Sequence, residues 1–160
     1  MRGGGKRLKN CRFLVRDACD TQFADASFDT IIAAGIIHHL PIAKSLQEIS
    51  RLLRPQGKAI FLEPLGANPF IKLYRKLTPN ARTPDETPLT RSDVATIQNI
   101  FHPVSIGFYG LTTLLSIPLR HNQRIFSMWY NILYFIDKVL FITPARWWAW
   151  TIVVEGSKRH

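Results

Sequence analysis

Ionisable side chains follow three apolar segments of the sequence, and they are the residues that could carry chemistry. Asp17 and Ala18 follow RFLVR, His38 and His39 follow an isoleucine-rich run, and Glu63 follows KAIFL. Ligands bind beyond the carboxyl ends of the strands in an open parallel sheet. If the three segments are neighbouring strands, these side chains lie along one crevice. A histidine there could remove a proton from an oxygen or nitrogen nucleophile.

The cysteines of the sequence do not indicate a metal site. Cys11 and Cys19 lack CxxC spacing, and no histidine lies close to them in sequence. Such cysteines are typical of unpaired thiols in a reducing compartment. No apolar stretch follows the basic residues 1–10, so no signal peptide is recognised. We therefore expect no metal, and a cytoplasmic location.

A strand–helix–strand unit is predicted to position the histidines and Glu63. Residues 28–37 are a nearly continuous apolar run, which is typical of a central parallel strand buried on both faces. Residues 58–63 form the next predicted strand, after a helix over 41–53. Such units cross over right-handed into a parallel sheet. Residues 12–16 are a further, short strand candidate.

The helix predicted over residues 41–53 is amphipathic. Ile42, Leu46, Ile49 and Leu53 recur at spacings of three and four. Four polar side chains of the segment are expected to face solvent, namely Lys44, Gln47, Glu48 and Arg51.

The second half of the chain is predicted to add helices and two closing strands. Thr90 resembles a helix N-cap, with Asp93 three residues on as a partial capping box. The elements expected are a short helix over 68–77, an irregular proline-rich stretch over 78–89, a helix over 91–101, and strands over 104–109 and 151–155.

Residues 110–150 form an apolar, aromatic segment, and two helices are expected in 110–141, broken near 118–122. The run 125–142 raises the question of a membrane span. Asp137 and Lys138 lie inside it, and each charge at the centre of a spanning helix costs roughly 2.5–3.5 kcal/mol. A buried or interfacial helix is therefore favoured, acting as a lid or as a membrane-contact segment.

Two stretches together resemble the class I S-adenosylmethionine-dependent methyltransferases of the type 11 kind. RDACDTQFADASFD, residues 16–29, is similar to their DA..LPF.D.SFD pattern. Residues 38–57, from HHL to LRPQG, are similar to HHL...L.E..R.LRPGG. The resemblance implies an α/β fold, a Rossmann-like sheet with helices on both faces and an aromatic-rich helical insert at 110–150. Residues 11–160 would then be a partial methyltransferase domain after a flexible basic tail, 1–10.

The resemblance also implies roles for single residues. Asp17 matches the position that accepts a hydrogen bond from the adenine amino group of S-adenosylmethionine, and Ala18 the position whose N–H reaches the adenine ring. His38 and His39 would lie near the methyl group as catalytic candidates, and Glu63 would bind substrate. Structural alternatives stay open: Asp17 as a turn former, one histidine packed and the other capping a helix, and Glu63 as a solvated strand end.

Two parts of the family pattern have no counterpart in this sequence: the glycine-rich cofactor loop and the acidic residue that binds the ribose. Gly3, Gly4 and Gly5 are not preceded by a strand, as such a loop requires. We therefore expect a sheet that lacks its first strands and has an open edge with exposed apolar surface. We also expect weak or no binding of S-adenosylmethionine by the 160-residue chain.

Three functions remain open at this level: a methyltransferase for a small-molecule, apolar or lipid-like acceptor; a non-catalytic remnant of one; and a peripheral membrane-surface protein. The formal charge of +10 favours anionic partners. Beyond residue 16 the basic residues are scattered, which makes nucleic acid an unlikely partner. Four tryptophans in the insert suit an apolar acceptor or a lipid headgroup layer, although core packing explains them equally well: Trp129, Trp147, Trp148 and Trp150.

Overall fold

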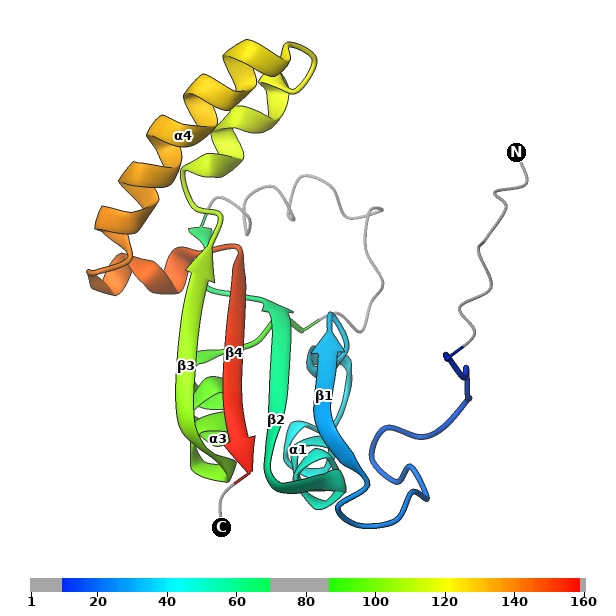
Figure 1. The fold of residues 1–160 in the computed structure, drawn as a ribbon. Helices are drawn as coiled ribbons and strands as arrows, with labels where there is room; N and C mark the ends of the chain where they lie inside the picture. Colours follow the sequence, from blue (N-terminus) through cyan, green and yellow to red (C-terminus); the bar gives the residue numbers. More distant parts are fainter. Residues whose placement is uncertain (1–9, 70–86, 159–160) are drawn as a thin grey trace.

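A computed structural model describes residues 10–69 and 87–158. Its centre is a four-stranded sheet in the order β1-β2-β4-β3 (Figure 1). The strands are β1 (Phe28–Ala34), β2 (Leu53–Pro64), β3 (Phe101–Tyr109) and β4 (Thr151–Lys158). β1 pairs with β2 in parallel, whereas β4 runs antiparallel to both of its neighbours. The predicted α/β, Rossmann-like class is confirmed, and so are strands near 58–63, 104–109 and 151–155.

One face of the sheet is covered by α1 (Ile42–Leu52) and α3 (Arg91–Ile100), which lie side by side behind the strands in Figure 1. The core forms where their apolar stripes meet the sheet, and it is completed by Phe61, Phe101 and Val154, all fully buried. Burial at about 25 cal/mol per Å² of apolar surface is the main source of stability here. Helices 41–53 and 91–101 are thus confirmed, each within two residues of its predicted bounds.

The opposite face of the sheet carries apolar side chains that stay partly accessible. Ile32 on β1 is 68% exposed and Leu62 on β2 is 43% exposed. Within the described residues, α1 and α3 occupy one face only, so the expected helices on both faces are not found there. β1 is an edge strand and not the central strand, buried on both faces, that its apolar run predicted, because the described chain supplies no strand beyond it. The expected open edge and exposed apolar surface are therefore present.

The N-cap predicted at Thr90 is confirmed. The Asp93 amide donates to Thr90 Oγ1 at 3.4 Å, and the Thr90 amide donates to Asp93 Oδ2 at 2.8 Å. This reciprocal pair is a complete capping box, which stabilises the first turn of α3.

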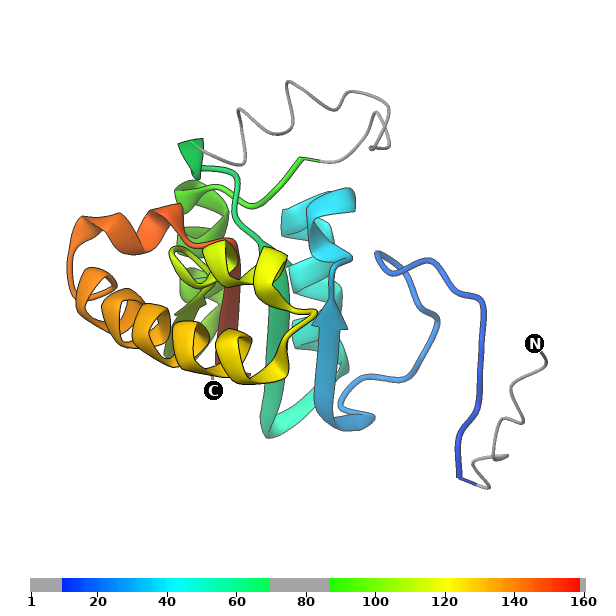
Figure 2. The same ribbon diagram turned by 90° about the horizontal axis from the view of Figure 1, so that it is seen from above.

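The strand predicted over residues 12–16 is wrong. These residues form no ladder with any described strand, and they lie away from the edge strand β1 (Figure 2). Phe13 and Val15 are 89% and 102% exposed. A β-strand requires a partner for its backbone N–H and C=O groups, and an apolar sequence alone does not supply one.

The insert folds as a hairpin of two helices that projects past the end of β3 (Figure 1). The 3-10 helix η3 (Thr113–Leu119) leads into α4 (Gln123–Leu140), with the break at the predicted place. A further 3-10 helix, η4 (Pro144–Trp148), returns the chain to β4. Among the described helices, none has the length and apolar character needed to cross a bilayer.

Parts of two predictions lie outside the described residues. The helix expected over 68–77 and the irregular stretch over 78–89 fall largely within residues 70–86, and the tail 1–10 with its three glycines lies almost wholly within 1–9. These expectations stay predictions.

Candidate functional site

A tight turn follows β1 and presents two backbone amides to the neighbouring strand. Gly35 has φ +63°, a conformation that glycine adopts without strain. Its N–H donates to the carbonyl of Leu62 on β2 at 2.8 Å, the last ladder bond before the turn. The strand therefore ends at Ala34, three residues before the predicted boundary, and Ile36 and Ile37 turn their N–H groups toward Glu63.

Glu63 is buried at the carboxyl end of β2, with an exposed fraction of 1%. Its Oε1 atom accepts hydrogen bonds from the amides of Ile36 and Ile37, each at 3.0 Å. Its Oε2 atom lies 2.5 Å from Nδ1 of His38. Both carboxylate oxygens are thus engaged within the protein, and Glu63 holds the turn that carries His38.

His38 belongs to the short 3-10 helix η1 (Ile37–His39) and is 6% exposed. With Glu63 as a carboxylate, which only accepts hydrogen bonds, the hydrogen between His38 and Glu63 would lie on Nδ1. In the neutral ring, Nε2 is then the unprotonated nitrogen that can accept a proton. A carboxylate that fixes the tautomer of a histidine in this way is a recurrent arrangement for general-base chemistry.

His39 differs from His38 in its surroundings. It is exposed, and its ring centroid lies 4.0 Å from that of His38 at an interplanar angle of 40°. Neither histidine caps α1, whose N-cap is Pro41 without a side-chain hydrogen bond. The structure therefore separates the pair into a buried, oriented ring and an accessible one.

Asp17 and Ala18 lie in a turn that follows residues 11–16. Asp17 Oδ1 accepts from the amide of Cys19 at 2.8 Å, and the amide of Asp20 donates to the Asp17 carbonyl at 3.2 Å. The Asp17 side chain is exposed and Ala18 is half-buried. Within the described part of the chain, no hydrogen bond engages Asp17 Oδ2 or the Ala18 N–H.

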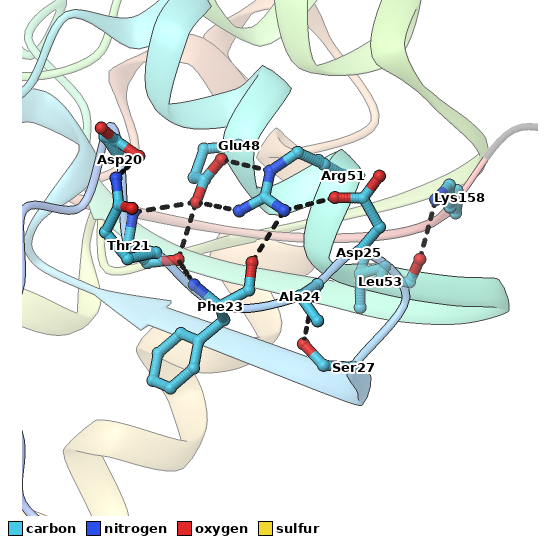
Figure 3. Close-up of polar contacts among 11 residues, drawn as sticks. Asp20, Thr21, Phe23, Ala24, Asp25, Ser27, Glu48, Arg51, Leu53 and Lys158 are labelled. Carbon is cyan, nitrogen blue, oxygen red and sulfur yellow. Dashed lines mark hydrogen bonds and ion pairs between the residues drawn. The ribbon is translucent and has the colours of Figure 1, made fainter.

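Glu48 and Arg51 hold the segment that follows this turn, and their predicted orientation toward solvent is wrong (Figure 3). Glu48 is only 8% exposed, and its Oε1 accepts from the amide of Thr21 at 2.9 Å and from Thr21 Oγ1 at 2.7 Å. Arg51 binds both Glu48 oxygens, donates to the carbonyl of Phe23 at 2.8 Å and pairs with Asp25. The network ties residues 21–25 to α1 and thereby places the Asp17 turn.

The electrostatics of this cluster favour its charged form. The hydrogen bond from Arg51 is the largest influence on the pKa of Glu48, and together with the bonds from Thr21 it outweighs burial and lowers that pKa to about 2. Sequence reasoning missed these contacts because the apolar stripe alone assigned the helix faces. An acidic and a basic residue three apart on a helix are an available signal, but they do not reveal a third partner far away in sequence.

An apolar cavity of about 440 Å³ lies at the same end of the sheet as the His38–Glu63 pair. Its lining combines the chain just after β2 with the insert: Asn68, Leu111, Thr112, Leu114, Leu115, Leu140, Ala145 and Trp148. Asn68 follows Glu63 by five residues, and its Nδ2 donates to the carbonyl of Trp148 at 2.6 Å. The insert thus forms one wall of the space beyond the strand ends.

The open α/β sheet, with an oriented histidine beyond its strand ends, is typical of a ligand-binding α/β domain, and comparison with known families shows which of them the chain is similar to. Residues 2–61 match the family described as a methyltransferase domain. This match spans 60 of the 160 residues, and together with the shared fold it supports the predicted resemblance to the class I S-adenosylmethionine-dependent methyltransferases.

Individual relatives share the same part of the chain. Demethylmenaquinone methyltransferase of Thermotoga maritima is 39% identical over 64 residues, which is 39% of this chain and 28% of that protein. The ubiquinone/menaquinone biosynthesis C-methyltransferase UbiE of Rickettsia prowazekii is 40% identical over 57 residues, which is 35% of this chain and 23% of the relative. The chain thus spans less than a third of the length of these curated relatives.

Solved structures share the fold over nearly the whole chain. The YcgJ protein of Bacillus subtilis superposes with a TM-score of 0.57 at 15% identity, covering 96% of this chain and 73% of that chain. Phosphoethanolamine N-methyltransferase 2 of Haemonchus contortus, solved in complex with S-adenosyl-L-methionine, gives a TM-score of 0.54 at 16% identity over 90% of this chain and 36% of its own. At these identities the likeness concerns the fold.

Proposed function

We propose that this chain carries the acceptor side of an S-adenosylmethionine-dependent methyltransferase, with a small apolar molecule as the methyl acceptor. The observation that carries the proposal is the buried His38–Glu63 pair, held by two amides just beyond the carboxyl ends of β1 and β2. Ligands of open α/β sheets bind at that edge. A buried histidine–carboxylate pair at that edge is suited to proton transfer.

His38 is proposed as the general base and Glu63 as its positioning residue. Glu63 keeps the hydrogen of the ring on Nδ1, so that Nε2 can accept a proton from the acceptor. In a quinol, loss of the hydroxyl proton makes the neighbouring ring carbon nucleophilic. That carbon would bond to the methyl group as the methyl–sulfur bond breaks, and it would then lose its own proton. Bound S-adenosylmethionine would supply an electrophilic methyl group. General-base catalysis of this kind contributes typically 10²–10⁴-fold in rate.

Asp17 and Ala18 fit the adenine side of that cofactor. A carboxylate oxygen and a backbone N–H that are unengaged within the described chain can accept from an amino group and donate to a ring nitrogen. Glu48 and Arg51 would support this contact indirectly, because they anchor the segment that follows the turn. The role of these residues as cofactor ligands rests on the family pattern together with this geometry.

The acceptor is proposed to be lipid-like. The cavity beyond the strands is lined mostly by leucine, alanine and tryptophan side chains, with Asn68 and Thr112 as its polar groups. A pocket of this composition binds apolar ligands and orients them by few hydrogen bonds. The two relatives named for menaquinone or ubiquinone precursors support the same acceptor class.

The proposal is tested by transfer of a tritiated methyl group from S-adenosylmethionine, at millimolar concentration, to a prenylated naphthoquinol. Wild-type chain should place label in the organic phase, and His38→Gln should lower the rate by about 100-fold or more. His121→Gln, an exposed histidine in the insert, is the matched control and should retain the rate.

Three outcomes would overturn the proposal. Full activity of His38→Gln would remove the role of His38, and a loss confined to His39→Gln would transfer it to the exposed ring. Absence of label with the wild-type chain would show that the chain does not perform this reaction by itself.

A further inference from the structure

The outward side of α4 carries a continuous apolar surface. Seven side chains recur along it at spacings of three and four, and each is 40–69% exposed. This outer stripe consists of Ile125, Met128, Trp129, Ile132, Phe135, Ile136 and Val139. Large contiguous apolar patches of this kind mark binding surfaces on soluble domains.

The opposite side of α4 already packs within the hairpin. Leu133 and Asp137 are 9% and 2% exposed, and they lie one turn apart. An amphipathic surface helix has one apolar stripe, which faces the core. α4 has a second stripe that no described residue covers, so the core does not account for it.

The hairpin presents this stripe on a fixed frame. Asp137 accepts from the amides of Leu111 and Thr112 at 3.1 and 2.6 Å, and from the hydroxyls of Thr112 and Thr113 at 2.6 and 2.8 Å. Although burial raises the pKa of Asp137, these hydrogen bonds outweigh it and hold the pKa below its usual range. A charged Asp137 therefore fastens the start of η3 to the last turn of α4.

Cations surround the stripe without acidic partners. Asp137 is the only acidic residue of 110–150, and it is engaged internally. Arg124 and Lys138 lie fourteen residues apart on one side of α4, and Arg120 and Arg146 lie near its two ends. In the part of the chain that the structure describes, none of these four forms a salt bridge. Lys138 and Arg146 instead lie over the rings of Tyr134 and Phe108, contacts that leave their charges uncompensated. An apolar stripe beside cations without acidic partners complements an anionic lipid surface.

We propose that the hairpin of η3 and α4 binds anionic bilayers, with α4 lying in the headgroup layer and its outer stripe inserted. Figure 1 shows the hairpin standing clear of the sheet, which leaves the stripe accessible to a flat surface. A second copy of the chain is a poorer occupant, because a two-fold interface would bring the same unpaired cations together. This inference is independent of the methyl-transfer proposal.

The test is co-sedimentation of the full chain with two vesicles: pure phosphatidylcholine, and phosphatidylcholine containing about one-third phosphatidylglycerol. Binding should favour the anionic vesicle and weaken as salt rises. Phe135→Ser should lower binding about tenfold or more. Phe13→Ser should not, because Phe13 is an exposed phenylalanine far from the hairpin in sequence. Arg124→Gln combined with Lys138→Gln should weaken binding by about fivefold per charge, against no change for Arg12→Gln with Lys44→Gln.

Three results would overturn the proposal. The first is no pelleting with either vesicle, and the second is equal binding by Phe135→Ser and Phe13→Ser. The third is a lipid-free dimer that Phe135→Ser converts to a monomer, which would assign the stripe to contact between copies. If Phe135→Ser shows no cooperative unfolding transition and is therefore not folded, Met128→Ser provides a second variant, because the Met128 side chain is 55% exposed.

Discussion

The Nδ1 atom of His38 and the Oε2 atom of Glu63 lie 2.5 Å apart across two neighbouring strands, although 25 residues separate them in sequence. The other oxygen of Glu63 is fixed by the amides of Ile36 and Ile37. The position of the His38 ring is therefore set by the end of one strand and by the turn after another. This relationship is the basis of the proposed chemistry.

Asp17 is predicted to affect cofactor binding more than stability. By calorimetry, the 160-residue chain should bind S-adenosylmethionine more weakly than low-micromolar, and Asp17→Ala should weaken it further by about 1–3 kcal/mol, because a ligand donor loses its acceptor. Since the Asp17 side chain is exposed, the thermal midpoint should change little. Asp20→Ala, in the same turn, is the control. Unchanged affinity with a large loss of stability would make Asp17 only a turn former.

Acid should weaken the anchor between α1 and residues 21–25. Because the folded pKa of Glu48 is about 2, below its ordinary 4.5, its contribution to stability is complete above about pH 4.5 and is lost as the pH falls toward 2. Arg51 is one-third exposed, so screening limits the contribution to about 1 kcal/mol. Urea unfolding at about pH 6 and pH 3 should show a larger drop for wild type than for Glu48→Gln. Equal drops would contradict the assignment.

Asp137→Asn should destabilise the hairpin by about 2–3 kcal/mol, because the neutral amide offers one acceptor oxygen to several donors and turns its NH₂ toward the others. Chemical denaturation measures the loss. Asp29→Asn is the matched control: Asp29 forms a surface ion pair with Arg54, and its loss should cost less than about 1 kcal/mol. A cost at Asp137 no larger than at Asp29 would show that the cluster does not hold the hairpin.

Local patterns in the sequence were sufficient for α1, α3 and the two helices of the hairpin, and for most strands. The apolar spacing placed 41–53, and the capping residues Thr90 and Asp93 marked the start of α3. The strand predicted over residues 12–16 is wrong because a strand needs a neighbouring strand to pair with, which a five-residue apolar run does not specify. Glycine at residue 35 set the end of β1 through its positive φ, a detail that an apolar run does not reveal.

The candidate site was predictable as a set of strand ends but not as a network. The rule for open sheets placed His38 and Glu63 at one edge, and the structure joins them by a hydrogen bond. The buried state of Glu63 was not foreseen, because the two amides that satisfy it come from a turn whose geometry the sequence does not encode directly. Glu48 was assigned to solvent for a related reason, since its partner Thr21 is 27 residues away.

The most direct test of the account is the protonation of the His38 ring, read from nitrogen-15 shifts and long-range proton couplings at about pH 8, where a free imidazole is neutral. We predict hydrogen on Nδ1 and a bare Nε2, with the opposite tautomer in Glu63→Gln, whose amide can donate to Nδ1. The rate of methyl transfer by Glu63→Gln should also fall, because Nε2 then carries a hydrogen and cannot accept a proton. A wild-type ring with hydrogen on Nε2 and a bare Nδ1 would contradict the proposal that Glu63 prepares His38 as a base.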